Sequence, residues 1–182
     1  MTNYHQSQSE STVPEADNHS KIMKHSRILL LATMVLSLLL DQLSKFWLSN
    51  HLTIHRPIEI FGNYVRLFLT RNYGLIWGIP IKSDLLYLIL PTIGIIFVAY
   101  IGLKTKVKFS AIAYGLLIGG AIGNLIDRIR LSYVIDFIDM GIKDNRWPTY
   151  NIADSAIFIG LVMIIAREIF KPNPKTIEYP NA

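Results

Sequence analysis

The sequence predicts an all-α polytopic membrane protein with four transmembrane helices and a small β-structured cap on the extracytoplasmic side. Of its 182 residues, 51% are hydrophobic and 17% are charged, and the apolar residues gather in long runs rather than in alternating patterns. Four of these runs approach the roughly 20 residues that a helix needs to cross about 30 Å of hydrocarbon. Polar and acidic residues recur near the same end of these runs. One compact four-helix membrane domain accounts for these observations.

The four runs define the expected membrane domain, residues 27–170, with transmembrane segments at about residues 28–48, 85–103, 107–126 and 152–170. Residues 1–26 are polar and include Pro14, so we expect a disordered tail. The first run follows basic residues as a secretory signal does, but it is long and has no small-residue cleavage site, so it should remain in the protein. Residues 171–182 form the expected cytoplasmic tail.

Positive charge near the helix ends predicts the orientation. Basic residues precede the first run, crowd the short connection between the second and third runs, and follow the fourth: Lys21, Lys24, Arg27; Lys104, Lys106, Lys108; Arg167, Lys171, Lys175. The other loops also carry Arg and Lys, so the prediction depends on the density of charge in the short connection. Both termini are expected in the cytoplasm, which places Asp41, Asp127 and Asp154 at the outer, periplasmic face.

The two expected outer loops contain β-prone stretches. Residues 58–61 and 64–70 flank a Gly62-Asn63 turn, and residues 133–138 alternate in the same way. A small sheet at the membrane surface is therefore predicted. An interfacial aromatic belt accounts for Trp47.

Asp127 and Asp154 are the most informative residues, because ionisable groups at membrane depth are expensive and usually functional. Each follows an asparagine by three residues. Asp127 also ends a row of small residues spaced by four, Ala111, Gly115, Gly119 and Gly123, which lets a neighbouring helix approach closely. Packing alone also explains each glycine, but not the acid that ends the row. The row should press Asp127 against a partner helix, with Asp154 as the best candidate to face it.

Two carboxylates in a partly dehydrated site cannot both ionise cheaply, so one keeps a proton. The pair then supplies a general base and a general acid for attack of water on a peptide carbonyl. The chain has no Cys to act as a nucleophile. His51, His55 and Glu59 have a spacing that resembles a metal site, but they fall in a Pro-containing loop, where solvated side chains are the preferred interpretation. No metal or cofactor is expected.

Five short motifs occur in order along the chain, and together they resemble the lipoprotein signal peptidase (signal peptidase II) family. They are Asp41-Gln42-Leu43-Ser44-Lys45, Asn72-Tyr73-Gly74, Gly119-Gly120-Ala121-Ile122-Gly123-Asn124-Leu125-Ile126-Asp127-Arg128, Val134-Ile135-Asp136-Phe137 and Asn151-Ile152-Ala153-Asp154. The resemblance covers about residues 27–170, and the third and fifth motifs are highly specific.

The resemblance implies a membrane aspartic endopeptidase of the bacterial inner (cytoplasmic) membrane. Such an enzyme removes the signal peptide of diacylglyceryl-modified prolipoproteins on the amino side of the lipidated cysteine. Asp127 and Asp154 match the family's catalytic pair. The implied partners are prolipoprotein signal peptides, membrane lipids and the inhibitor globomycin, with no nucleic acid.

Eight further residues are candidates for binding substrate or inhibitor or for orienting the acids: Asp41, Lys45, Asn72, Gly74, Asn124, Arg128, Asp136 and Asn151. A simple pair between Asp41 and Lys45, one helical turn apart, is an alternative for those two. An interfacial anchor is an alternative for Arg128. Asp136 is kept as a structural hydrogen-bonding partner, whereas Asp139 is expected to be a solvated loop carboxylate.

Two departures from the family pattern are Leu75-Ile76-Trp77, where small residues are common, and Tyr150, where Phe is common. The first bears on substrate and inhibitor preference. A small proton- or cation-coupled transporter is the alternative function; it predicts acids at several depths or an inverted repeat, and the sequence shows neither.

Overall fold

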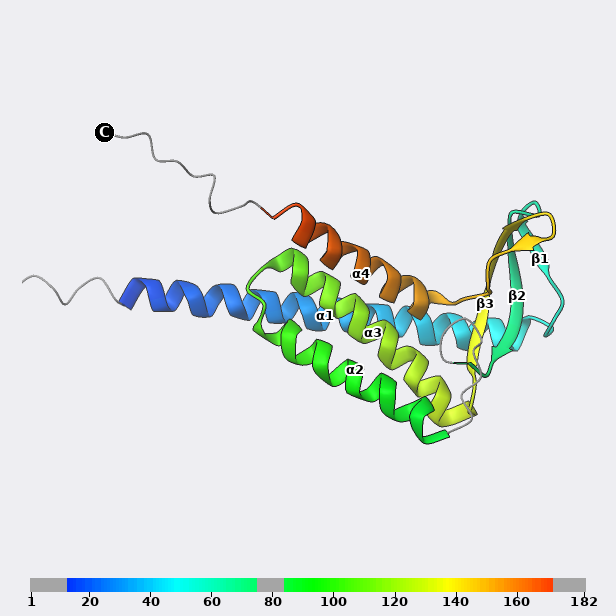
Figure 1. The fold of residues 1–182 in the computed structure, drawn as a ribbon, viewed down its shortest axis with the longest axis horizontal. Coiled ribbons are helices and arrows are strands. Elements are labelled where there is room, and N and C mark those ends of the chain that lie inside the picture. Colours follow the sequence, from blue (N-terminus) through cyan, green and yellow to red (C-terminus); the bar gives the residue numbers. More distant parts are fainter. Residues whose placement is uncertain (1–12, 75–83, 172–182) are drawn as a thin grey trace, which may run out of the picture.

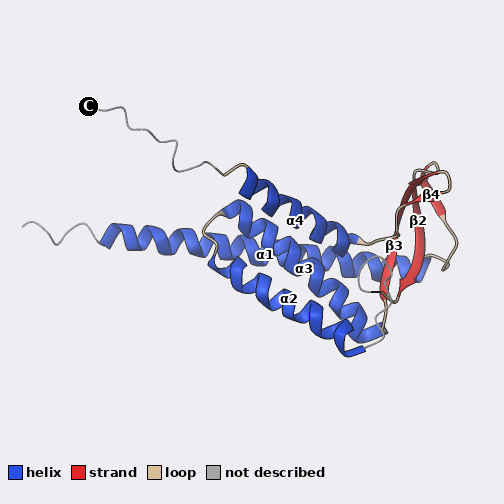
Figure 2. Cartoon of the chain, in the orientation of Figure 1, coloured by secondary structure: helices blue, strands red, loops and turns tan. Residues whose placement is uncertain are grey.

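The computed structural model describes residues 13–74 and 84–171. These residues form a bundle of four helices with a small sheet at one end (Figure 1). The helices are α1 (Val13–His51), α2 (Asp84–Lys104), α3 (Lys108–Leu131) and α4 (Ile152–Ile169). The strands are β1 (Ile58–Phe61) and β2 (Val65–Asn72), which follow α1, and β3 (Val134–Ile142) and β4 (Asn145–Arg146), which lie between α3 and α4 (Figure 2).

The four helices coincide with the four apolar runs, but α1 begins earlier than expected. It starts at Val13, so the prediction of a disordered tail is wrong for residues 13–26, while residues 1–12 lie outside the described part. Adding residues to an existing helix costs much less than starting one. Pro14 lies in the first turn of α1, where its missing N–H has no helical partner to lose.

The small residues of α3 bring two neighbouring helices close on two different faces. A Cβ at Gly119 would lie 2.4 Å from the Met34 carbonyl oxygen of α1. A Cβ at Gly120 would lie 2.4 Å from the Ala153 carbonyl oxygen of α4. The predicted row of small residues therefore presses the end of α3 that carries Asp127 against α1, while α4 packs on the adjacent face of α3.

The outward surfaces of the bundle are apolar, as the composition predicts. Phe46 of α1, Phe97 of α2 and Phe158 of α4 are 72%, 62% and 67% exposed, which suits contact with lipid rather than water. Among the described helices, three are long and apolar enough to cross a membrane: Asn18–His51, Tyr87–Lys104 and Lys108–Leu131. The fourth, α4, has only 18 residues and carries charged residues near both ends.

The described strands form one antiparallel sheet in the order β1-β2-β3-β4. This confirms the small sheet that the β-prone loops predict. Leu48 of α1, Leu69 of β2 and Phe137 of β3 form a buried cluster that fixes the sheet on the bundle. As a result, Asn72 at the end of β2 and Asp136 in β3 lie next to the helix ends.

Asp139 is buried rather than solvated, so the expectation for this residue is wrong. It is 2% exposed and lies opposite Arg66 across β2 and β3. Its Oδ2 accepts a 2.7 Å hydrogen bond from Nε of Arg66, and its Oδ1 accepts a 3.0 Å bond from Nε of Arg146. Burial acts to raise the pKa of Asp139, but the hydrogen bonds from Arg146 and Arg66 outweigh it and hold that pKa below its ordinary value. The two arginines thus tie β2, β3 and β4 together.

Candidate active site

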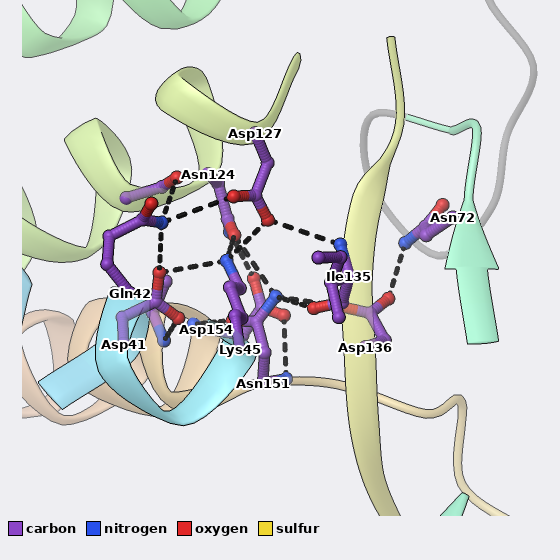
Figure 3. A network of polar contacts seen from close by, with 12 residues as sticks. Asp41, Gln42, Lys45, Asn72, Asn124, Asp127, Ile135, Asp136, Asn151 and Asp154 are labelled. Carbon is purple, nitrogen blue, oxygen red and sulfur yellow. Dashed lines mark hydrogen bonds and ion pairs between the residues drawn. The ribbon is translucent and has the colours of Figure 1, made fainter. Parts of the chain in front are cut away.

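A buried polar network occupies the end of the bundle that meets the sheet (Figure 3). Three helices and two strands contribute to it, so it depends on residues far apart in the sequence. Its members are Asp41, Gln42 and Lys45 of α1, Asn72 of β2, Asn124 and Asp127 of α3, Ile135 and Asp136 of β3, and Asn151 and Asp154 at the start of α4.

Lys45 supplies a buried cation to this network. Its side chain is 2% exposed, and Nζ lies 2.8 Å from Oδ2 of Asp41 and 2.9 Å from Oδ2 of Asp127. Nζ also donates a 2.9 Å hydrogen bond to Oδ1 of Asn124. The simple pair of Asp41 and Lys45 is thus only part of the arrangement, because the same ammonium group joins α1 to α3.

Asp127 receives donors from three directions. Besides the Lys45 ion pair, Oδ1 accepts a 3.2 Å bond from Nε2 of Gln42, and Oδ2 accepts a 3.2 Å bond from the backbone N–H of Ile135. The last contact arises because α3 ends at Leu131 and Ser132 adopts the left-handed conformation, with φ 64°. The chain turns back there, and β3 passes beside the acid.

Asp154 is fixed by the start of α4. Asn151 is the N-cap, and the two residues form a capping box: Oδ1 of Asn151 accepts from the Asp154 N–H at 2.9 Å, and Oδ2 of Asp154 accepts from the Asn151 N–H at 3.2 Å. The carboxylate also lies at the positive end of the helix dipole. Asp154 is half-buried, whereas Asp127 is fully buried.

Asn124 connects the two acids. Its Nδ2 donates a 2.8 Å hydrogen bond to Oδ1 of Asp154, while its Oδ1 accepts from Nζ of Lys45, the partner of Asp127. The described contacts therefore join the two aspartates through Lys45 and Asn124 rather than to each other. Asn124 therefore donates to Asp154 on the neighbouring helix. Its spacing of three residues from Asp127 suggests instead that it would orient the acid on its own helix.

Asp136 is another buried carboxylate, and it brings the end of β2 to the network. Its Oδ1 accepts a 2.7 Å bond from Nδ2 of Asn151, and its Oδ2 accepts a 2.9 Å bond from Nδ2 of Asn72. Oδ1 of Asn72 in turn accepts from the Gly74 N–H at 2.8 Å. Burial, together with the charge on nearby Asp154 when that group is ionised, raises the pKa of Asp136 to about 7, although the Asn72 hydrogen bond opposes this rise. Asn72 and Gly74 therefore reach the acids through Asp136.

Asp41 ties α1 to the start of α4. It is fully buried, and its Oδ1 accepts a 2.9 Å hydrogen bond from the Ala153 N–H. A Cβ at Gly123 would lie 2.5 Å from Oδ2 of Asp41, so the last glycine of the α3 row leaves the space that this carboxylate fills.

Arg128 lies against α2. Its guanidinium carbon is 4.9 Å from the centre of the Tyr87 ring, and the residue is 8% exposed. The Tyr87 hydroxyl donates a 3.4 Å bond to the Asn72 carbonyl. Such burial fits a packed arginine better than an interfacial anchor.

Gln42 is a network residue that the sequence reasoning missed. Its Nε2 lies within hydrogen-bond distance of Asp41 Oδ2, the Gly123 carbonyl and Asp127 Oδ1, at 3.1, 3.1 and 3.2 Å. The available signal was its place three residues before Lys45, on the same face of α1.

The two departures from the family pattern have different outcomes. Leu75-Ile76-Trp77 lies outside the described residues. The backbone of Tyr150 bridges to Ile138, and its hydroxyl lies 2.8 Å from the Met140 sulfur, away from the acids.

Comparison with known proteins gives a consistent result. The family described as "Signal peptidase (SPase) II" matches residues 33–170. A lipoprotein signal peptidase of Syntrophus aciditrophicus (strain SB) is 35% identical over 161 residues, which cover 85% of this chain and all of that protein. One from Buchnera aphidicola subsp. Schizaphis graminum (strain Sg) is 39% identical over 137 residues, covering 71% of this chain and 86% of that protein.

The fold is shared as well. A bacterial membrane enzyme solved by the in meso method at 2.3 Å superposes with a TM-score of 0.74 at 29% identity, covering 84% of this chain and 94% of that one. With the sequence motifs, the family match and the fold in agreement, this chain belongs to the signal peptidase II family of membrane aspartic proteases.

Proposed function

We propose that this chain is the endopeptidase that removes signal peptides from diacylglyceryl-modified prolipoproteins, cutting on the amino side of the lipidated cysteine. Asp127 and Asp154 act on water as general base and general acid. The observation that carries the proposal is the chain of contacts from Asp127 through Lys45 and Asn124 to Asp154, which brings two acids from different helices into one buried network.

The surroundings of the two acids support different roles for them. Asp127 forms an ion pair with Lys45 and accepts two further hydrogen bonds, all of which stabilise the carboxylate form. Asp154 accepts from neutral amide groups, and it is the more exposed of the two. Asp127 therefore serves as the base, and Asp154 carries the shared proton.

The reaction follows from these roles. Asp127 takes a proton from water as the water oxygen bonds to the scissile carbonyl carbon, and Asp154 donates a hydrogen bond to the developing oxyanion. The C–N bond then breaks, and the amine leaves with one proton from the pair. The pair ends with one proton, as it began, and no covalent intermediate forms.

The orientation is part of the proposal. All four helices cross the bacterial inner membrane, both termini lie in the cytoplasm, and the sheet with its acids lies at the periplasmic face. Basic residues at the opposite end of the bundle support this orientation. In this position the acids are at the depth where a lipid-anchored cysteine enters. The proposal also includes inhibition by globomycin, which the family resemblance implies.

The test is cleavage of a diacylglyceryl-prolipoprotein by purified protein, comparing wild type with Asp127→Asn and Asp154→Asn. The matched control is Asp144→Asn, the same substitution at an exposed turn of the sheet. We expect loss of turnover in the first two variants, full activity in the control, and no effect of chelators. Unmodified prolipoprotein should be a poor substrate.

Other outcomes would contradict the proposal. Turnover in a folded Asp127→Asn or Asp154→Asn variant would exclude the assigned pair. Acid-dependent proton flux in proteoliposomes without cleavage would instead favour the transporter. The gathering of Asp41, Asp127 and Asp154 in one network, rather than at several depths, argues against that alternative.

A further inference from the structure

A groove lies where α3 begins and α4 ends. Figure 1 shows these two helix ends at the end of the bundle opposite the sheet. It has a volume of about 440 Å³. Four of its lining residues are apolar and two are cationic: Val107, Phe109, Ala166, Phe170, Arg167 and Lys171. The groove is therefore mostly apolar, with two cationic side chains in its lining.

The charges at this groove favour an anion. Lys108 is exposed beside it at the first position of α3, and the first turn of that helix has no acidic residue. The nearby carboxylate is that of Glu168, whose Oε1 lies 3.3 Å from Nη1 of Arg167. This carboxylate is 57% exposed, so its pairing with Arg167 is weak. Among the described residues at the groove, positive charge exceeds negative charge.

The apolar lining narrows the choice of anion. Val107 and Phe109 are 40% and 46% exposed, and Phe170 is 81% exposed. A free phosphate would leave these surfaces uncovered, whereas an acyl chain would cover them while its headgroup stays beside the two cations. Juxtamembrane Lys and Arg residues attract anionic lipids in this way.

We propose that this groove binds one anionic phospholipid, with an acyl chain along Ala166 and Phe170 and a phosphate headgroup at Arg167 and Lys171. The inference rests on the membrane location in the proposed function, but not on its chemistry. A lipid seated there fills the space between the start of α3 and the end of α4. Both helices carry site residues at their opposite ends. It is therefore a structural ligand of the bundle.

The experiment uses the full-length protein in a neutral detergent. It is titrated with phosphatidylglycerol and with phosphatidylcholine of identical acyl chains, and bound lipid is counted by native mass spectrometry. We expect one phosphatidylglycerol to bind in preference to phosphatidylcholine. Each cation contributes about fivefold to this preference, so Arg167→Gln with Lys171→Gln should reduce it about 25-fold.

Two further variants separate the groove from general surface charge. Lys21→Gln with Lys24→Gln removes the same charge from α1 at the same end and should leave the preference unchanged. Ala166→Phe keeps every charge but fills the groove, and it should reduce binding of phosphatidylglycerol at least tenfold.

The proposal fails if wild type binds both lipids equally, if the α1 variant loses as much preference as the groove variant, or if Ala166→Phe binds normally. It also fails if phosphatidylglycerol does not bind the full-length protein but binds a variant that lacks residues 172–182. The chain's own C-terminal segment would then be the occupant of the groove. Prolipoprotein cleavage is measured on the same samples. If wild type shows no lipid preference but still cleaves prolipoprotein, this inference alone is overturned; if Asp127→Asn remains active, the proposed function alone is overturned.

Discussion

Replacing Lys45 with Met tests the centre of the polar network. The substitution keeps an unbranched side chain one atom shorter and removes the ammonium group that contacts Asp41, Asp127 and Asn124 at 2.8, 2.9 and 2.9 Å. Two carboxylates that are at most 3% exposed would lose their cation. Removing one partner of a buried ion pair typically costs about 3–5 kcal/mol. We expect Lys45→Met to lose about that much unfolding free energy.

The same change should also impair catalysis. Asp127 would keep its bonds from Gln42 and Ile135 but lose its ion pair, so its carboxylate would no longer be held in one position. Misplacement of a catalytic group by about 1 Å can cost about 100-fold in rate. We expect turnover of prolipoprotein to fall by at least about 100-fold, measured under conditions where the variant is still folded.

A second substitution separates the charge effect from a packing effect. Asp41→Asn keeps an oxygen to accept from the Ala153 N–H but removes one of the two orphaned charges. The double variant should therefore be more stable than the sum of the single losses predicts, by about 1–3 kcal/mol. Unfolding in detergent provides the measurement, and Lys143→Met at an exposed turn is the control. Additive losses, or a Lys45→Met protein of wild-type stability and rate, would refute the reasoning.

The remaining predictions concern Asp136, the contact between α3 and α1 at Gly119, and the side-chain amide of Gln42. The folded pKa of Asp136, about 7, exceeds the ordinary value of 3.8, so the folded state binds this proton more tightly. Wild type should therefore lose up to about 4 kcal/mol of stability as pH rises from about 4 to about 7, and Asp136→Asn should lack this loss. Gly119→Ala places a Cβ 2.4 Å from a backbone oxygen and should cost about 1–3 kcal/mol, whereas Gly94→Ala, with nothing within 4 Å, should not destabilise. Gln42→Leu removes a donor to the Asp127 carboxylate and should lower kcat about 10- to 100-fold while the protein stays folded.

Each of these predictions has a result that contradicts it. For Asp136, thermal melts from pH 4 to 8 with the same slope in wild type and Asp136→Asn would exclude it as the titrating group. Equal stability of the Gly119→Ala and Gly94→Ala proteins would show that the close approach of α3 and α1 is not maintained in the membrane. For Gln42, an unchanged kcat would mean that Lys45 and the Ile135 N–H are sufficient to hold Asp127.

Much of this molecule could be predicted from local sequence features. Length and apolar character identify the helices, because the backbone of a membrane-embedded segment must satisfy its hydrogen bonds internally. Local β propensity predicts the sheet, since the β-prone residues 58–61 and 64–70 flank the Gly62-Asn63 turn. The start of α1 is the exception. Residues 13–26 are helical, but they have no apolar pattern from which a helix could be predicted.

The contacts between acids and their partners required the tertiary structure. Spacing along α3 shows that Asp127 shares a face with the glycine row, but not which helix covers that face, since this depends on the rotation of α3 about its own axis. The role of Asn124 as a donor to Asp154 depends on the same rotation. Asp139 is buried because the register of β2 and β3 sets it opposite Arg66, and no local pattern encodes that register.

The sequence by itself determined the membrane class, the helices, the sheet and the two acids with their family motifs, because each of these is a property of one continuous segment. The tertiary structure decided that Lys45 and Asn124 connect those acids, that Gln42 joins them, and that Asp136 links them to Asn72. These contacts join side chains from segments up to 85 residues apart. They form only when the helix faces and the strand register are fixed together.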